Sequence, residues 1–322
     1  MTEHILSCDW GTTNLRIALV NLKEARAVYI HRSDRGIGPV YSIWDKQKNE
    51  DKRTHFSNVL AEELNNIPQK TGTSIDRLPL IVSGMASSQN GLEELPYATL
   101  PFRVDGNDTL VSKFTPSDTL PFPMWLTSGV CSPNDVMRGE ETQLIGICRS
   151  MDINSGVLVF PGTHSKHIHV EDGKVVAFKT YMTGEMFQLM TKNSMLRSTV
   201  EKENINFSEV RTAFEKGVIN GSNQNLLNVL FSVRANRLLK LMTKGENWHY
   251  LSGSLLGSEL ITLAKADQPV YLCGGGDLSA LYRSAFGILG LADRLITVPP
   301  DIVDQAVFTA HAYLFSTIFN QP

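Results

Sequence analysis

The hydrophobic positions of the chain gather into short apolar runs, and two of these runs end in a polar turn that contains Gly and Thr. Residues 4–8 lead into Asp9-Trp10-Gly11-Thr12-Thr13-Asn14, and a second apolar run, residues 15–20, follows at once. In the second half, residues 156–160 precede Pro161-Gly162-Thr163-His164-Ser165-Lys166, and residues 168–170 follow. Short apolar runs bounded by turn residues are typical of strands. Each half is therefore predicted to begin with a strand, a polar turn and a second strand.

Further strands and several helices are predicted along the rest of the chain. Apolar residues recur at helical spacing over residues 56–64, 225–242, 250–264, 278–289 and 304–319. Residues 27–30, 78–82 and 270–273 predict strands, and residues 137–146 are placed on a helix near the middle of the chain. Strands that alternate with helices indicate an α/β protein.

The length of the chain predicts two lobes. A chain of 322 residues is long for a single core, so the expected lobes are residues 1–150 and 151–322. The last predicted helix, residues 304–319, is expected to pack back toward the first lobe. The sequence contains no tandem repeat, so a duplication of the lobes rests on the two similar turns alone.

Composition excludes some classes of partner. A net charge of −3 argues against a general attraction to nucleic acid or to an anionic membrane, and no apolar run approaches the length of a membrane span. A cytoplasmic location is expected, and a homodimer is left open. The four cysteines show no C-x-x-C spacing and are expected to be buried thiols: Cys8, Cys131, Cys148 and Cys273.

The two Gly-Thr turns are candidate phosphate-binding sites. Small side chains and backbone N–H groups in residues 11–14 can form a concave row that receives phosphate oxygens. Asp9, at the end of the preceding strand, can hold a hydrated Mg²⁺, an ion that prefers one or two carboxylates together with substrate phosphates. Gly162 and Thr163 can contribute an N–H and a hydroxyl in the same way, and Lys166 a positive charge. An ordinary β-hairpin is the alternative that these residues leave open.

A Gly-rich turn precedes one of the later helices. Residues 274–277, Gly-Gly-Gly-Asp, stand where a helix N-terminus would offer unpaired N–H groups. A dinucleotide fingerprint fits poorly because its third Gly is replaced by Ser279, and no P-loop motif is present. A helix start that needs Gly only for packing is the alternative. Gly253 and Gly257 share one face of another predicted helix, where a backbone or a flat ligand can approach closely.

Three acids are candidates for a catalytic base. Glu140 and Glu141 follow Gly139, and adjacent helical residues point about 100° apart, so at most one of them faces a given cleft. Asp135 is the rival, and a solvated helix face is the alternative for each acid. The nearby histidines lack a third ligand that would complete a metal site. His164 is therefore expected to form hydrogen bonds beside two surface histidines, His167 and His169.

The segment that begins at residue 83 is dense in small hydrogen-bonding groups. Ser83, Gly84 and Met85 follow a predicted strand, and the segment continues to Tyr97. Such a loop suits a polyhydroxylated ligand, whose recognition needs several donors and acceptors fixed on a scaffold. A plain surface loop is the alternative.

Residues 9–16 resemble the first phosphate motif of the sugar kinase and actin superfamily, and specifically that of the 2-dehydro-3-deoxygalactonokinase family. The resemblance extends over nearly the whole chain, through residues 136–143, 161–166, 182–186, 231–234 and 251–257. It implies a two-lobed actin-like ATPase fold, which is ribonuclease H-like, with a nucleotide cleft between the lobes. It also implies a kinase that uses ATP and Mg²⁺ to phosphorylate the 6-hydroxyl of 2-dehydro-3-deoxy-D-galactonate.

The resemblance also implies roles for individual residues. Asp9 would hold Mg²⁺, and Glu140 would be the base, with Asp135 as its rival. The remaining roles fall into two sets. Phosphate and adenosine binding is expected of Gly11, Thr12, Thr13, Asn14, Gly162, Thr163, Ser252, Gly253, Gly274, Gly275 and Gly276. Sugar-acid binding is expected of Ser83, Gly84, Met85, Tyr97 and His164, with Arg16, Arg138 and Lys166 as candidate cations for the carboxylate of the sugar acid.

Two other functions stay open at this point. The phosphate apparatus is shared among sugar kinases, so the chain can act on another sugar or sugar acid. A non-catalytic nucleotide-binding or sugar-sensing protein, such as a regulator or an actin-like assembly module, is the alternative from a different class. No basic cluster supports a regulator that binds DNA.

Overall fold

The computed structural model describes residues 2–203, 206–265 and 267–319, and the chain forms two compact units. Unit 1 comprises Met1–Asn154, Val170–Ala177 and Asp301–Pro322, and unit 2 comprises Ser155–His169 and Phe178–Pro300. The first crossing from unit 1 to unit 2 thus falls a few residues after the predicted boundary at 150. The chain returns to unit 1 twice, and its last helix belongs there.

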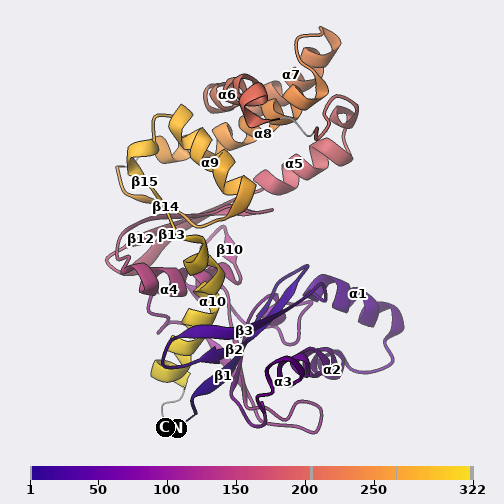
Figure 1. Cartoon of the computed structure of the whole chain (residues 1–322), viewed down its shortest axis with the longest axis vertical. Coiled ribbons are helices and arrows are strands. Elements are labelled where there is room, and N and C mark those ends of the chain that lie inside the picture. The colour runs from indigo at the N-terminus through magenta and orange to yellow at the C-terminus, as the bar shows by residue number, and fades with distance from the viewer. Residues whose placement is uncertain (1, 204–205, 266, 320–322) are drawn as a thin grey trace. The chain divides into compact units, whose positions relative to one another are not determined.

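A six-stranded sheet forms the centre of unit 1, in the order β3-β2-β1-β4-β8-β7. The strands are β1 (His4–Trp10), β2 (Leu15–Asn21), β3 (Arg26–Ser33), β4 (Leu80–Gly84), β7 (Val111–Phe114) and β8 (Met124–Thr127). The first three form an antiparallel meander (Figure 1), and β1, β4 and β8 run parallel. In this register Asp9 lies opposite Arg16 on one side and Ser83 on the other. Residues that end separate apolar runs are therefore neighbours.

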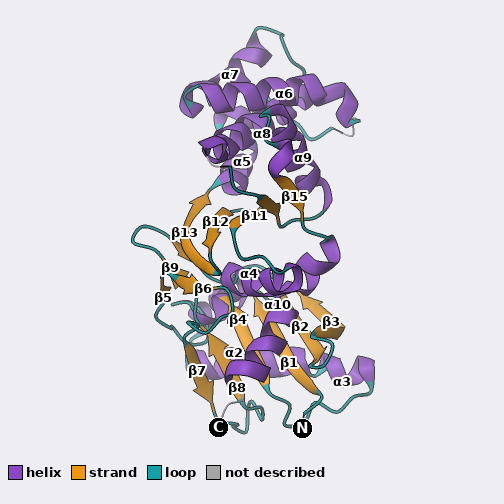
Figure 2. Cartoon of the chain, turned by 90° about the vertical axis from the view of Figure 1, so that its left-hand side faces the viewer, coloured by secondary structure: helices purple, strands orange, loops and turns teal. Residues whose placement is uncertain are grey.

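Helices cover the sheet of unit 1. They are α1 (Ile37–Gln47), α2 (Lys52–Leu64), α3 (Asn66–Thr71), α4 (Glu140–Met151) and α10 (Pro300–Leu314), and a π-helical turn, Phe315–Phe319, follows α10. The helices α4 and α10 lie side by side (Figure 2). A Cβ at Gly146 would stand less than 3.0 Å from the backbone of Ala306, so these helices touch through their backbones.

Short elements complete unit 1. A 3₁₀ turn (Met85–Ser87) follows β4, and β5 (Ala98–Thr99), β9 (Val130–Cys131) and β10 (Val136–Met137) form a small sheet in the order β10-β9-β5.

The second large sheet has the order β15-β14-β11-β12-β13-β6. Its strands are β6 (Phe102–Arg103), β11 (Gly156–Phe160), β12 (Ser165–Glu171), β13 (Lys174–Tyr181), β14 (Val270–Leu272) and β15 (Leu295–Thr297). In the sheet of unit 1, β2 and β3 lie on one side of β1 and β4 and β8 on the other; in the second sheet, β12 and β13 lie on one side of β11 and β14 and β15 on the other. The repeated order confirms the predicted α/β architecture, a two-lobed actin-like fold.

Unit 2 carries most of its residues in helices: α5 (Thr183–Lys192), α6 (Phe207–Asn223), α7 (Leu226–Leu238), α8 (Lys244–Leu260) and α9 (Gly276–Ile288). Short 3₁₀ turns lie at Met195–Ser198, Ile261–Lys265 and Ala292–Arg294. Two glycines of α6 and two of α8 let these helices touch. A Cβ at any of the four would stand less than 3.0 Å from a carbonyl oxygen of the other helix: Gly217, Gly221, Gly253 and Gly257.

Several local predictions need correction. The helix predicted over 137–146 begins only at Glu140, because Met137 ends β10 and Gly139 has φ = 107°. The helix predicted over 225–242 ends at Leu238, and its Leu227 is 77% exposed instead of packed. All four cysteines are free, but Cys131 is only partly buried. None of the helices in the described part of the chain is long and apolar enough to span a membrane.

Candidate active site

The first Gly-Thr turn, residues 11–14, packs against the start of α1 and is hydrogen-bonded to it. The N–H groups of residues 36–38 donate to the carbonyls of residues 11–13 over 2.9–3.1 Å, and the Gly11 N–H donates to the Asn14 carbonyl at 2.9 Å. A Cβ at Gly36 would stand less than 3.0 Å from the turn. The side chains of Thr12, Thr13 and Asn14 are exposed. The carbonyls of the turn are thus used in the fold, while its small polar side chains face solvent.

Asp9 ends β1 directly before this turn. Its Oδ2 accepts from Nη2 of Arg16 at 2.6 Å and from Nε at 3.0 Å. Its Oδ1 faces the end of β4, where a Cβ at Gly84 would lie 3.4 Å away. Gly84 has φ = 84°, a conformation that favours glycine. One carboxylate oxygen is therefore taken by a cation, and the other lies beside space that a side chain would fill. A hydrated Mg²⁺, bound through one carboxylate, fits this arrangement.

The start of α4 lies beside the same strand end. A Cβ at Gly139 would lie 3.5 Å from the Cα of Gly84. Glu140, partly exposed, accepts from the Arg138 N–H at 3.1 Å. Glu141 is 1% exposed and accepts from the Gly139 N–H over 2.7–2.9 Å. Burial, with the charge of Glu140 as the smaller cause, raises the pKa of Glu141 to about 8. The structure thus separates the two acids, and Glu140 is the one that solvent reaches.

Asp135 stands apart from the start of α4 along the chain, in the turn between β9 and β10. Its Oδ1 accepts from the Val136 N–H at 2.7 Å, and its carbonyl accepts from the Ser132 N–H at 2.8 Å. These bonds give Asp135 a local role in shaping its turn.

Arg138 joins two parts of the predicted sugar-acid loop. Its guanidinium lies 4.2 Å from the centre of the Tyr97 ring, and its Nη1 donates to the carbonyl and the hydroxyl of Ser87, both at 2.6 Å. Its buried Nε has no hydrogen-bond partner among the described residues. The hydroxyl of Ser83, opposite Asp9 in the sheet, is likewise buried without a partner there. Met85, which is partly buried, begins the 3₁₀ turn after β4.

Lys166, the third candidate cation, lies in unit 2. It is 5% exposed on β12, and its Nζ donates to Oγ1 of Thr180 at 2.8 Å. Lys166 is therefore buried, with its ammonium group bonded to the neighbouring strand β13.

The second Gly-Thr turn is backed by the start of α5. A Cβ at Gly184 would stand less than 3.0 Å from the Gly162 carbonyl oxygen, and the Glu185 N–H donates to the Thr163 carbonyl at 2.9 Å. His164 follows in the turn, and its Nε2 lies 2.5 Å from Oε2 of Glu185. As predicted, His164 forms a hydrogen bond.

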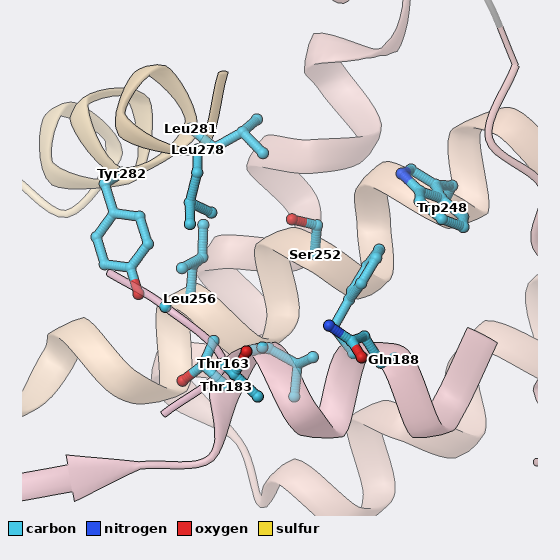
Figure 3. Close-up of a pocket in the computed structure, with 13 residues that line it drawn as sticks. Thr163, Thr183, Gln188, Trp248, Ser252, Leu256, Leu278, Leu281 and Tyr282 are labelled. Carbon is cyan, nitrogen blue, oxygen red and sulfur yellow. The ribbon is translucent and has the colours of Figure 1, made fainter. Parts of the chain in front are cut away.

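A pocket of about 360 Å³ opens beside this turn within unit 2 (Figure 3). Thr163 lies at one end, and the helices α5, α8 and α9 supply mostly apolar walls. The lining residues are Gly162, Thr163, Thr183, Gly184, Phe187, Gln188, Trp248, Ser252, Leu255, Leu256, Leu278, Leu281 and Tyr282. A largely apolar cavity with a few polar groups at one end suits a flat heterocycle that carries a polar tail.

The predicted adenosine residues divide between this pocket and other places. Ser252 lines it, whereas Gly253 faces α6 and serves helix packing. Gly275 is the N-cap of α9, Gly276 has φ = 62°, and Gly274 packs on the ring of Pro161. These three glycines form the start of α9, which supplies Leu278, Leu281 and Tyr282 to the pocket wall.

The expectation of surface histidines is wrong for His167. His167 is buried, and its Nε2 lies 2.9 Å from Oε1 of the buried Glu259. Alternation along β12 turns its side chain into unit 2, toward α8. No group of three metal-ligating side chains occurs in the parts of the chain that the structure describes.

Part of the pocket was not anticipated from the sequence. Phe187 and Gln188 on α5 and Trp248 on α8 line it, yet nothing in their own segments marks them as ligand-binding. The signal that points to α5 is the motif of residues 182–186, one of the motifs that carry the resemblance to the family. Gly184 within it is the residue that packs on the second turn.

Comparison with known proteins gives a consistent result. Residues 9–307 match the family model described as 2-keto-3-deoxy-galactonokinase. The chain is 29% identical over 297 residues to a probable 2-dehydro-3-deoxygalactonokinase of Rhizobium meliloti (strain 1021), covering 89% of this chain and 90% of the relative. It is 26% identical over 302 residues to the 2-dehydro-3-deoxygalactonokinase of Escherichia coli (strain K12), covering 90% of this chain and 91% of the relative.

A crystal structure assigned as a 2-dehydro-3-deoxygalactonokinase, from Sinorhizobium meliloti, is also similar. It superposes with a TM-score of 0.80 at 28% identity, and covers 98% of this chain and 99% of the other. The similarity therefore extends through both units.

Proposed function

Because the chain belongs to the 2-keto-3-deoxy-galactonokinase family, we propose that it transfers the γ-phosphoryl group of ATP to the 6-hydroxyl of 2-dehydro-3-deoxy-D-galactonate. The match over residues 9–307 carries this proposal, since it includes both Gly-Thr turns and the start of α4. Phosphoryl transfer asks little covalent chemistry of a protein. It needs aligned oxygens, neutralised charge and an acceptor for the hydroxyl proton.

The nucleotide site of this proposal is the pocket of unit 2. Its apolar walls suit the adenine ring, and Ser252 offers a hydroxyl beside it. The Gly162-Thr163 turn, with the N-terminal turn of α5 behind it, offers N–H and hydroxyl groups to phosphate oxygens. The glycines of residues 274–276 let the start of α9 approach the adenosine without side chains in the way.

Asp9 is the proposed holder of Mg²⁺, through the Oδ1 that Arg16 leaves available. When bound, Mg²⁺ neutralises charge on the β- and γ-phosphates and helps to fix their orientation. The exposed Thr12, Thr13 and Asn14 then provide small polar groups for the same phosphates.

The sugar acid is placed beside β4, Tyr97 and Arg138, with the N–H groups and small side chains of residues 83–85 near its hydroxyls. Among the three candidate cations, Arg138 suits the carboxylate best. Arg16 is already paired with Asp9, and Lys166 is buried and bonded to Thr180. Arg138 has no carboxylate partner among the described ion pairs and carries an unused N–H. Glu140, two residues further on, accepts the proton of the attacking hydroxyl.

A coupled assay of ADP release tests this function. MgATP is supplied with 2-dehydro-3-deoxygalactonate, with its gluconate epimer, or with no acceptor. Turnover that depends on 2-dehydro-3-deoxygalactonate is expected. Glu140→Gln should lower kcat by about 10²–10⁴-fold, the usual contribution of a general base. Asp135→Asn should stay within about threefold of the wild type, since Asp135 bonds locally in its own turn.

Other outcomes discriminate the alternatives. Turnover with a different sugar or sugar acid would show that the chain is a kinase for that substrate and not for 2-dehydro-3-deoxygalactonate. ATP hydrolysis that ignores every acceptor, or no turnover at all, would favour a nucleotide-binding or sensing protein. A cytoplasmic location and assembly as a homodimer stay predictions.

A further inference from the structure

A buried carboxylate collects hydrogen bonds from three elements around the pocket of unit 2. Glu259, on α8, is 2% exposed. Its Oε1 accepts from the Ser165 hydroxyl at 2.7 Å and lies 2.9 Å from Nε2 of His167, both on β12. The Tyr282 hydroxyl of α9 lies 3.0 Å from each carboxylate oxygen, and the Thr183 hydroxyl, at the start of α5, donates to Oε2.

Two of these partners are themselves pocket residues. Thr183 and Tyr282 line the cavity, and Figure 3 shows the Tyr282 hydroxyl directed toward the end where Thr163 and Thr183 lie. Ser165 stands two residues after Thr163, at the point where the turn becomes β12. A single side chain is therefore bonded to the second phosphate turn, to the helix start that backs it and to one wall of the pocket.

The chemistry of the cluster favours a fixed geometry. A buried carboxylate must accept hydrogen bonds from protein groups in place of water. Losing one donor costs more stability than the hydrogen bond itself contributes, because the carboxylate oxygen is left unsatisfied. Burial, with the charge of Glu259 as a further cause, raises the pKa of Tyr282 well above its ordinary value, so its phenol stays a donor. Because the Glu259 carboxylate is buried and cannot turn toward solvent, it holds each donor in one orientation.

We propose that Glu259 is a positioning residue for the nucleotide, which sets the second phosphate turn, the start of α5 and the α9 wall in the arrangement that binds ATP. This inference rests on the proposed function in taking the pocket as the nucleotide site. Glu259 does not line the pocket, so it acts through Ser165, Thr183 and Tyr282.

The test is calorimetric titration of the folded protein with ADP, alongside steady-state kinetics. Glu259→Gln should weaken ADP binding by about tenfold and raise KM for ATP more than it lowers kcat, with KM for the sugar acid unchanged. Tyr282→Phe removes one donor and should weaken ADP binding by roughly threefold.

Matched variants separate positioning from loss of stability. Tyr250→Phe is the control for Tyr282→Phe, because Tyr250 is equally buried in the same unit and its hydroxyl bonds to Asn220 away from the pocket. Should Glu259→Gln fail to fold, Ser165→Ala takes its place, with Ser7→Ala as control. Ser7 is another fully buried strand serine, bonded to His311 in unit 1. Both controls should bind ADP within twofold of the wild type.

The inference is overturned if the folded variants of the cluster bind ADP as the wild type does and only melt earlier. It is also overturned if the wild type binds no ADP. Wild-type protein that binds ADP but transfers no phosphate to a sugar acid would refute the proposed function alone, and the ADP affinities of the variants would still decide the role of Glu259.

Discussion

Both Gly-Thr turns are supported from behind by the first residues of a helix, and in both a glycine makes the contact. Gly36 packs on residues 12–13 in unit 1, and Gly184 packs on residues 162–163 in unit 2. The first turn receives three backbone hydrogen bonds from its helix start, whereas the second receives one, from the Glu185 N–H. The second turn consequently depends more on side chains for its shape.

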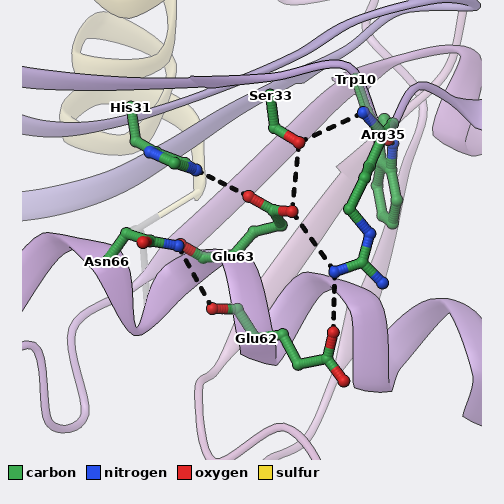
Figure 4. A network of polar contacts seen from close by, with 7 residues as sticks. All are labelled: Trp10, His31, Ser33, Arg35, Glu62, Glu63 and Asn66. Atoms are coloured by element: carbon green, nitrogen blue, oxygen red, sulfur yellow. Dashed lines mark hydrogen bonds and ion pairs between the residues drawn. The ribbon is translucent and has the colours of Figure 1, made fainter.

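Glu63 of unit 1 and Glu259 of unit 2, each a buried acid with several hydrogen-bond partners, differ accordingly. In unit 1, Glu63 lies between His31, Ser33 and Arg35, and Arg35 also pairs with Glu62 at the surface (Figure 4). Arg35 is 38% exposed, so solvent reaches this cluster. Its link to the first turn is indirect, since the Arg35 carbonyl accepts from Nε1 of Trp10 at 2.8 Å. Glu259 is instead enclosed and bonded to pocket residues. The comparison indicates that one turn is shaped by backbone and the other by a buried side-chain cluster.

The largest effects are expected from alanine at the two backing glycines. Gly36→Ala and Gly184→Ala each place a Cβ less than 3.0 Å from backbone atoms of a turn, so the turn must move. A displacement of about 1 Å near reacting groups can cost about 100-fold in rate. Each variant should therefore lose about that factor in kcat/KM. Gly184→Ala should lose more ADP affinity than Gly36→Ala, because the turn at residues 162–163 borders the pocket, whereas the first turn is proposed to meet the nucleotide only at its phosphates.

Gly287→Ala is the matched control. It lies on α9, and a Cβ there meets nothing within 4 Å, so alanine should be neutral or slightly stabilising. Normal kinetics in all three variants would show that neither turn depends on its backing glycine.

A substitution in the glycine contact between α6 and α8, away from the turns, should lower stability and leave ADP binding unchanged. Gly221→Ala forces a Cβ into the backbone of Ser254 on α8, an overpacking that typically costs about 1–3 kcal/mol. Chemical unfolding followed by circular dichroism measures this loss, and ADP titration of the folded protein should match the wild type. A large loss of ADP affinity would mean that the α6–α8 contact, and not only the backing of the turn, shapes the pocket.

Much of the fold could be predicted from the sequence because its signals are local. Apolar runs that end in Gly-Thr turns located β1, β2, β11 and β12, and the Gly-rich turn located the start of α9. The positive φ at Gly139 delays the start of the predicted helix by three residues, so that Glu140 is its first residue. What sequence spacing could not decide was which of two adjacent acids is buried, since that depends on what packs against α4.

The role of Gly253 and the burial of His167 depend on distant partners. Gly253 and Gly257 predict that another group approaches α8 closely, but they do not identify that group. The same spacing of four in Gly217 and Gly221 of α6 is the signal that identifies their partner. His167 meets Glu259, 92 residues later, and no local pattern links the two. The pocket residues Phe187 and Trp248 likewise come together only when α5 packs on α8.

Replacing Glu63 and Glu259 tests whether the difference between their two clusters matters for nucleotide binding. Glu63→Gln should cost about 1 kcal/mol of unfolding free energy, because solvent and Glu62 remain available to Arg35 and a glutamine oxygen still accepts from Ser33. ADP affinity should stay unchanged, in contrast to Glu259→Gln. Unfolding curves and ADP titrations of the two variants side by side give the answer. Equal losses of ADP affinity would remove the distinction between the two clusters.

The smallest effect is expected on wild-type stability between pH 4.5 and 6.5, where two buried groups of unit 1 act in opposite directions. Burial lowers the pKa of His311 to about 3, so between pH 3 and its ordinary 6.5 the unfolded chain binds more protons and stability rises with pH. The pKa of Glu141 is raised to about 8, so between its ordinary 4.5 and pH 8 the folded chain binds more protons and stability falls as pH rises. The two slopes, each at most about 1.4 kcal/mol per pH unit, oppose each other between pH 4.5 and 6.5.

Melting temperatures of the wild type should therefore change little between pH 4.5 and 6.5 and fall between pH 6.5 and 8. Glu141→Gln should abolish that fall, and His311→Asn should expose a decline that begins near pH 4.5. A wild type that gains stability from pH 6.5 to 8 would contradict the burial of an acid at the start of α4.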